Sequence, residues 1–201
     1  YKKRFVYLIS PNKIKNIFYN QLKDVLKSNK VNFFQLRLKK YSEKKIINIG
    51  KKIKKICKQF SVKLIINDNP MLAKKINADG CHIGQGDMDI LKSRKILKKK
   101  IIGITCHNSI KLVKRAIANN PNYIALGSFF PTNTKKITYK ANIKILKHTK
   151  KITDIPIVVV GGIKSSNYKK LLLNKANFLA ISSFIWKNKK LKPIEAIKEI
   201  K

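Results

Sequence analysis

Eight short apolar runs, rich in β-branched and aromatic residues, recur along the chain with helical patterns between them. Runs of this length and composition predict buried strands. Segment 42–60 illustrates the helical pattern, because Ile46, Ile49, Ile53 and Ile56 recur at three- and four-residue steps while lysines fill the other face. Strand followed by helix, repeated, restricts the fold to a parallel sheet with helical crossovers. The predicted strands are Phe5–Ile9, Phe33–Leu36, Lys63–Ile66, Gly80–Ile83, Ile101–Thr105, Tyr123–Leu126, Ile157–Val160 and Phe178–Ile181.

Eight such units without a Gly/Ser linker or a break in composition predict an α/β fold of the closed (βα)8 TIM-barrel type. A single domain is expected to occupy residues 1–201. Because this barrel typically takes about 250 residues, the helices must be short. The alternative is an open flavodoxin-like or Rossmann sheet. It is less favoured because the first predicted strand is followed by ISPNK and no GxGxxG phosphate loop.

The charge is strongly one-sided, with 47 Lys and Arg against 9 Asp and Glu, a formal net charge of +38. This excess excludes an acidic binding protein and favours an anionic ligand such as a phosphate. Only four of the cations are Arg, whereas nucleic-acid-binding proteins commonly use Arg for bidentate contacts. Lysines spread along nearly every segment favour a solvated, compositionally biased surface, and nucleic acid is the less favoured partner.

Three cysteines, at positions 57, 81 and 106, cannot all pair internally and show no CxxC spacing. They predict buried core thiols in a reducing compartment, with no disulfide framework. No apolar run approaches the roughly 20 residues of a membrane-spanning helix. We therefore expect a cytoplasmic protein with no membrane partner, and a homo-oligomer is compatible with the sequence.

Polar residues and glycines follow the predicted strands at their carboxyl ends, where barrels of this type carry their active sites. Alternation along QLRLK puts Gln35, Arg37 and Lys39 on the side facing the barrel mouth. The other strand-end candidates are Asn67, Asp68, Gln85, Asp87, Thr105, Thr132, Thr134, Lys135, Lys136, Gly161, Gly162, Ser182 and Ser183.

Asp68 and Asp87 stand out because acidic residues are scarce and these two follow neighbouring strands. Mg²⁺ commonly takes one or two carboxylates together with substrate phosphate oxygens, so the pair is a candidate magnesium site facing a diphosphate. The competing interpretation is that each aspartate caps the helix that follows it or stabilises a turn before that helix. The sequence alone leaves both interpretations open.

Two sequential Cys-His pairs, Cys81 with His82 and Cys106 with His107, resemble metal or nucleophile sites. Successive strand residues point to opposite faces, so neither pair can act together without a bend. Gly161 and Gly162 allow close approach of the backbone. With Ser182 and Ser183 they follow the seventh and eighth predicted strands, a frequent phosphate site in barrels.

The strand-end residues, in this order, closely resemble those of the thiamine phosphate synthase family. The resemblance runs from about Tyr7 to Trp186. It is carried by these segments: QLRLK, LIINDNP, ADGCHIGQGDMD, IIGITCHN, YIALGSFFPTNTKK, IPIVVVGGI and ANFLAISSFIW.

This resemblance implies a (βα)8 barrel that joins 4-amino-5-hydroxymethyl-2-methylpyrimidine diphosphate to 4-methyl-5-(2-phosphoethyl)thiazole, giving thiamine phosphate and diphosphate. It implies Mg²⁺ on Asp68 and Asp87, with Arg37, Lys39 and Lys135 compensating charge on the leaving diphosphate. The implied pyrimidine diphosphate contacts are Gln35, Arg37, Lys39, Asn67, Thr105 and Lys135, and the implied thiazole phosphate contacts are Thr132, Thr134, Gly162, Ile181 and Ser182.

Four positions depart from the family pattern. Leu38 replaces a common Glu and should point away from the mouth, and Thr105 replaces Ser while keeping a hydroxyl. Ser128 stands where Pro often occurs, and Gly86 stands for a Glu next to Asp87. The related thiazole tautomerases are the nearest enzyme alternative, but they typically lack the paired aspartates and the PTxTK loop.

Overall fold

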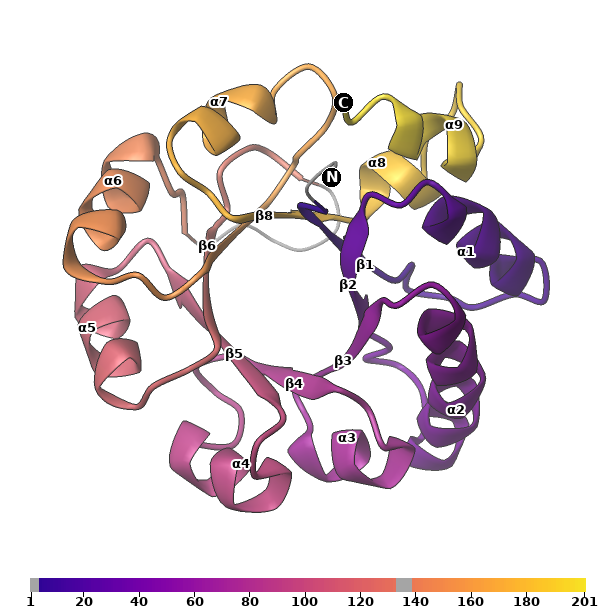
Figure 1. Cartoon of the computed structure of the whole chain (residues 1–201), viewed down its shortest axis with the longest axis horizontal. Helices are drawn as coiled ribbons and strands as arrows, with labels where there is room; N and C mark the ends of the chain where they lie inside the picture. Colours follow the sequence, from indigo (N-terminus) through magenta and orange to yellow (C-terminus); the bar gives the residue numbers. More distant parts are fainter. Residues whose placement is uncertain (1–3, 133–138) are drawn as a thin grey trace.

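The computed structural model describes residues 4–132 and 139–201, and the chain forms a closed barrel of eight parallel strands (Figure 1). Each strand pairs in parallel with the next, and β8 pairs with β1, so the sheet has no open edge. The predicted (βα)8 barrel is confirmed and the open-sheet alternative is wrong. The strands are β1 (Val6–Ile9), β2 (Val31–Leu36), β3 (Lys63–Asn67), β4 (Gly80–Ile83), β5 (Ile101–His107), β6 (Tyr123–Gly127), β7 (Ile157–Val160) and β8 (Phe178–Ile181).

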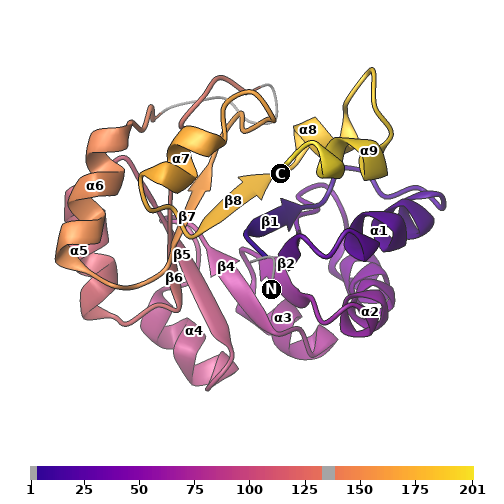
Figure 2. The same ribbon diagram turned by 45° about the horizontal axis from the view of Figure 1, so that its top comes forward.

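Helices form a ring around the barrel and cover its outer surface (Figures 1 and 2). The helix predicted over 42–60 begins at Glu43 and ends at Gln59, and Ile53 on its inner stripe is fully buried. Most of the others are shorter, as the chain length requires. The helices are α1 (Phe18–Lys27), α2 (Glu43–Gln59), α3 (Pro70–Ile76), α4 (Ile90–Leu97), α5 (Ile110–Ala118), α6 (Ile143–Ile152), α7 (Lys169–Leu173), α8 (Ser183–Trp186) and α9 (Pro193–Lys198).

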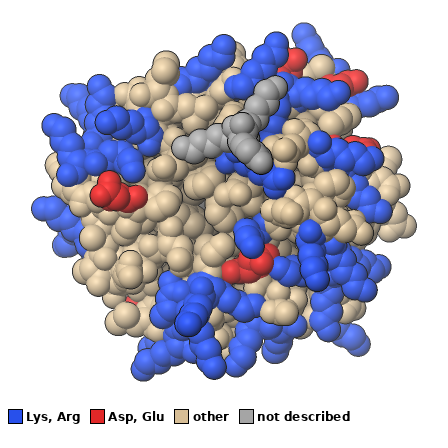
Figure 3. Space-filling model, viewed as in Figure 1, with Lys and Arg blue, Asp and Glu red and all other residues tan. Residues whose placement is uncertain are grey.

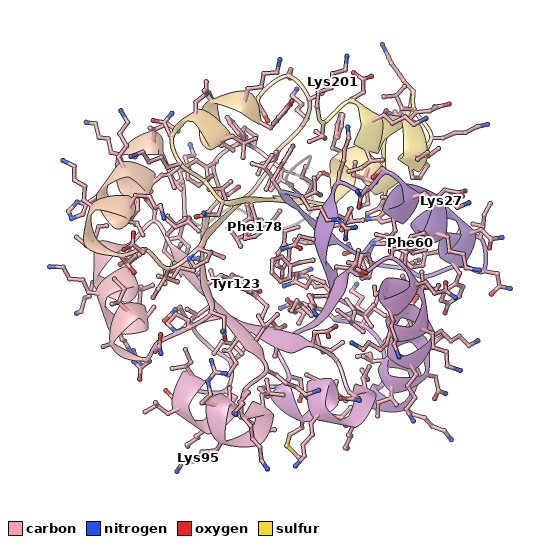
Figure 4. The ribbon with its side chains drawn as sticks, viewed as in Figure 1. Lys27, Phe60, Lys95, Tyr123, Phe178 and Lys201 are labelled. Atoms are coloured by element: carbon pink, nitrogen blue, oxygen red, sulfur yellow. The ribbon has the colours of Figure 1, made fainter. Side chains whose placement is uncertain are left out.

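Strand alternation divides the core into an outer layer beneath the helices and an inner layer inside the barrel. On β1, Val6 and Leu8 belong to the outer layer, whereas Tyr7 belongs to the inner one. Figure 4 shows Tyr123 and Phe178 inside the barrel, and Lys27 and Lys95 on the helices pointing outward. The inner layer consists of Tyr7, Ile65, Tyr123, Ala125, Val158 and Ala180, with Ile9, Phe33, Ile101, Val160 and Phe178 packed against it.

The distribution of charge on the surface and the burial of the cysteines both agree with the predictions from the sequence. Over the face shown in Figure 3, Lys and Arg side chains gather around the periphery, above the helices, and the centre is mostly uncharged apart from one acidic group with cations beside it. Cys57, Cys81 and Cys106 are free and fully buried, as predicted for core thiols. Among the described residues, no helix combines the length and apolar character needed to cross a bilayer.

Candidate active site

A pocket of about 500 Å³ opens at the carboxyl ends of the strands, and every strand or the loop after it contributes to its wall. Thr134, Lys135 and Lys136, predicted from the sequence, lie outside the described residues. The pocket brings together all the other predicted site residues: Gln35, Arg37, Lys39, Asn67, Asp68, Gln85, Asp87, Thr105, Thr132, Gly161, Gly162, Ile181, Ser182 and Ser183.

The end of β2 supplies a row of three polar side chains. Gln35, Arg37 and Lys39 line the pocket, whereas Leu38 is buried in the outer core, as the alternation predicts. The buried Ser10, which follows β1, holds this row in place. Its Oγ accepts a hydrogen bond from the Arg37 N–H (3.0 Å), and its own N–H donates to the Gln35 carbonyl oxygen (2.9 Å). Ser10 therefore fixes the backbone on both sides of Leu36, and this backbone carries the Arg37 side chain.

Asp68 and Asp87 both reach the pocket, and neither caps a helix. Asn69 caps α3, accepting from the Leu72 N–H, and Asp89 caps α4. Asp68 also has a positive φ of 65°, a conformation that only a few non-glycine residues adopt. The helix-capping interpretation is thus wrong for both carboxylates, whereas the turn interpretation is confirmed for Asp87, which accepts a hydrogen bond from the Gly84 N–H within its own turn.

The two carboxylates lie close enough to influence each other. Loss of hydration at the pocket wall raises the pKa of Asp87, and the Asp68 carboxylate raises it further, while a hydrogen bond from the Gly84 N–H (2.7 Å) lowers it. Lys39 Nζ lies 3.2 Å from Asp68 Oδ2. Two neighbouring carboxylates at a pocket mouth fit Mg²⁺, which needs few protein ligands when phosphate oxygens complete its shell. In the described part of the chain, no cluster of three or more His, Cys, Asp or Glu side chains suits a metal that needs more protein ligands.

The opposite wall is formed by the loops after β7 and β8. Gly161 and Gly162 have φ values of 109° and 57°, which glycine tolerates best. A Cβ on Gly161 would lie 1.8 Å from Ser128 Oγ, so the loop after β7 approaches the loop after β6 as closely as glycine allows. Ser182 lines the pocket next to them, and its Oγ donates to the Ser10 carbonyl oxygen (3.3 Å). The wall presents backbone groups and hydroxyls, without an acidic side chain.

A chain of polar groups inside the barrel was not predicted from the sequence; Gln35, Tyr7 and Tyr123 are buried in it, and His82 and Thr105 are half-buried. Gln35 Nε2 donates to the Tyr7 hydroxyl (3.2 Å), which lies 2.7 Å from the Tyr123 hydroxyl. The Tyr123 hydroxyl is 2.9 Å from His82 Nδ1, and His82 Nε2 is 2.8 Å from Thr105 Oγ1. We call these five residues the inner polar chain. It crosses the pocket floor from β2 to β5, and all five members line the pocket.

Burial keeps the inner polar chain uncharged. It raises the pKa of Tyr7 and of Tyr123 above the ordinary value, and it lowers the pKa of His82 to about 4. His82 faces the pocket while Cys81 is buried in the outer core, so this Cys-His pair is divided between two faces, as predicted. Strand alternation could have found the chain, because it places Tyr7, His82 and Tyr123 on the inner face.

The second Cys-His pair is divided as well. Cys106 is buried in the outer core, whereas His107 lines the pocket. Thr105 and His107 are two residues apart and both face the pocket, as strand alternation predicts, although the register of β5 against β6 shifts between them. Such an irregularity cannot be read from alternation alone.

Comparison with known proteins points to one family. Residues 6–185 match the family model described as thiamine monophosphate synthase. The thiamine-phosphate synthase of Pelagibacter ubique is 64% identical over 200 residues, covering 99% of this chain and 97% of that protein. The thiamine-phosphate synthase of Clostridium acetobutylicum is 34% identical over 190 residues, covering 93% and 89%.

Solved structures share the fold. A thiamine phosphate pyrophosphorylase from Pyrococcus furiosus superposes with a TM-score of 0.87 at 22% identity, covering 98% of this chain and 93% of that one. A thiamine phosphate pyrophosphorylase from Bacteroides thetaiotaomicron superposes with a TM-score of 0.69 at 13% identity, covering 98% and 95%. At these identities the likeness concerns the barrel alone.

Proposed function

This chain belongs to the thiamine monophosphate synthase family and is a transferase of that family, and we propose that its pocket joins a pyrimidine diphosphate to a thiazole phosphate. The observation that carries the proposal is the asymmetry of the pocket. One wall combines Arg37 and Lys39 with the Asp68–Asp87 pair, and the other presents glycine backbone and serine hydroxyls. The first suits a metal-bound diphosphate and the second suits a phosphate monoester.

On the first wall, Asp68 and Asp87 would hold Mg²⁺, which when bound neutralises charge on the diphosphate. Arg37 supplies a planar guanidinium that can make bidentate contacts with phosphate oxygens. Lys39 contributes a second cation beside Asp68, and Lys135 a third by the family pattern. Gln35, Asn67 and Thr105 offer amide and hydroxyl groups to the pyrimidine ring.

On the second wall, Gly162 and Ser182 would bind the thiazole phosphate, together with Thr132 and, by the family pattern, Thr134. Ile181, at the end of β8, packs its side chain in the outer core, so it would offer backbone groups to this phosphate. A phosphate monoester there keeps its charge during the reaction. This wall therefore positions the second substrate rather than stabilising the transition state.

The chemistry needs no protein nucleophile. The amino group of the pyrimidine ring can stabilise positive charge, so the bond from the methylene carbon to the diphosphate oxygen breaks first and its electron pair leaves with the diphosphate. The thiazole nitrogen then donates its lone pair to the methylene carbon. What the residues supply is compensation of charge on the leaving group by Arg37, Lys39 and Lys135, and alignment of the two rings.

The test is to incubate the protein with both substrates and Mg²⁺ and to separate the products. We expect thiamine phosphate and diphosphate in equal amounts, with neither formed when either substrate is omitted. Rearrangement of the thiazole phosphate alone, without coupling, would instead support a tautomerase and overturn the proposal.

The buried free thiols agree with a reducing compartment such as the cytosol.

A further inference from the structure

The direction of each hydrogen bond in the inner polar chain follows from counting which groups can donate. Gln35 Nε2 carries only hydrogens, so the Tyr7 oxygen accepts. The order that leaves neither tyrosine O–H unpaired then has the Tyr7 O–H donating to Tyr123. The Tyr123 O–H then has His82 Nδ1 as its acceptor. With Nδ1 accepting, the neutral imidazole carries its proton on Nε2 and donates to Thr105 Oγ1.

This order leaves one free group at each end of the chain. The Gln35 amide donates one N–H to the Tyr7 hydroxyl, and its Oε1 receives no hydrogen bond from another described residue. Thr105 Oγ1 has accepted from His82, so its own O–H remains available to donate. Both residues line the pocket. The pocket thus presents a carbonyl acceptor from β2 and a hydroxyl donor from β5.

The barrel is shaped to hold this chain. Tyr7 and Tyr123 are each 2% exposed, and their rings pack against each other and against Phe33. A Cβ on Gly103 would lie 1.9 Å from Tyr123 Cζ, so only glycine leaves room for this ring. An ordinary apolar layer would have filled the space without the two buried tyrosine hydroxyls, each of which costs stability unless it is paired.

We propose that Tyr7, Tyr123 and His82 are positioning residues that orient Gln35 and Thr105 for a ring bearing an amino donor beside a nitrogen acceptor. A 4-aminopyrimidine has this pattern, whereas a 4-oxopyrimidine reverses it, with a carbonyl acceptor beside a ring N–H donor. A pocket whose Gln35 and Thr105 cannot rotate rejects the reversed pattern because its polar groups would then lie unpaired. The inference rests on the proposed function and identifies the residues that set its choice of pyrimidine.

The test compares two non-reacting probes by calorimetry. They are the monophosphate of 4-amino-5-hydroxymethyl-2-methylpyrimidine and its 4-oxo counterpart. The variant is Tyr123→Phe, which keeps the ring that fills the space beside Gly103 but cuts the chain between Tyr7 and His82. The matched control is Tyr168→Phe. Tyr168 is 1% exposed, and its hydroxyl donates to the Lys201 carbonyl oxygen on the outside of the barrel.

We expect the wild type and Tyr168→Phe to prefer the amino probe strongly. In Tyr123→Phe that preference should fall about tenfold, because one buried hydrogen-bonding group is worth about that factor in binding. The KM for the thiazole phosphate should stay unchanged. Tyr7→Phe should give the same loss, and combining it with Tyr123→Phe should add little, since both cut one chain.

Three results would overturn the inference. One is an unchanged preference in a folded Tyr123→Phe or Tyr7→Phe protein that still forms thiamine phosphate, which would leave the proposed function standing. The second is a wild type that binds the 4-oxo probe as tightly as the amino probe, because the hydrogen-bond order would then be wrong. The third is a wild type that forms no thiamine phosphate, because the proposed function itself would then fail.

Discussion

Gly103 on β5 is the position where a single methyl group should disturb the barrel interior most. In Gly103→Ala the new Cβ would lie 1.9–2.4 Å from three atoms of the Tyr123 ring. The ring cannot swing away, because it packs against Tyr7, Phe33 and His82. The substitution must therefore displace Tyr123 or push β5 away from β6.

The cost has two parts. Overpacking a closed core costs about 1–3 kcal/mol. Displacing the Tyr123 hydroxyl also leaves the Tyr7 hydroxyl and His82 Nδ1 without their hydrogen-bond partner, which adds about 1–3 kcal/mol. We therefore expect Gly103→Ala to lower the free energy of unfolding by about 2–6 kcal/mol.

Urea denaturation measures this loss directly, and the chain offers a matched control. A Cβ on Gly86 meets no atom within 4 Å, so Gly86→Ala should stay within about 1 kcal/mol of the wild type. Replacing Tyr123 by Leu removes the clashing ring, and Gly103→Ala should then cost far less than in the wild type. A Gly103→Ala protein as stable as the wild type would refute the steric argument.

Three further predictions concern the pocket and the core. Ser182→Ala should raise the KM for the thiazole phosphate several-fold with kcat nearly preserved, because that phosphate keeps its charge; a raised KM for the pyrimidine diphosphate alone would contradict the assignment. Lys135→Ala should lower kcat and raise the KM for the pyrimidine diphosphate, because charge on the leaving group is then less compensated; steady-state kinetics with unchanged parameters would exclude the role. Burial raises the pKa of Cys57 and of Cys106 to about 12, so a thiol reagent at pH 8 should label neither cysteine in the native protein and both in urea; rapid labelling of the native protein would contradict their burial.

The fold could be predicted because two periodicities agree along the whole chain. Strand alternation and helical period each depend on local sequence, so the bounds of β4, β7 and β8 matched those of the predicted strands. The row Gln35, Arg37 and Lys39 followed from the same alternation. Strand ends converge in a closed barrel, and this convergence is why residues from distant segments could be expected in one pocket.

What escaped prediction depends on contacts between strands. The sequence could not show whether Asp68 caps a helix, and the structure excludes this because Asn69 caps α3. The hydrogen bonds of His82 depend on the register of β4 against β5 and on the space beside Gly103, neither of which a single segment encodes. The register shift of β5 against β6 between Thr105 and His107 is likewise a property of two paired strands.

The most direct test of the account is the rate of thiamine phosphate formation as a function of Mg²⁺ concentration, in the wild type and two aspartate variants. Asp87→Ala removes a proposed ligand, whereas Asp89→Ala removes the nearby cap of α4 and should cost about 1 kcal/mol of stability. We predict that the wild type and Asp89→Ala saturate with Mg²⁺ and stop with chelator, and that Asp87→Ala loses orders of magnitude in turnover while remaining folded. Full activity of Asp87→Ala in the presence of chelator would contradict the central claim.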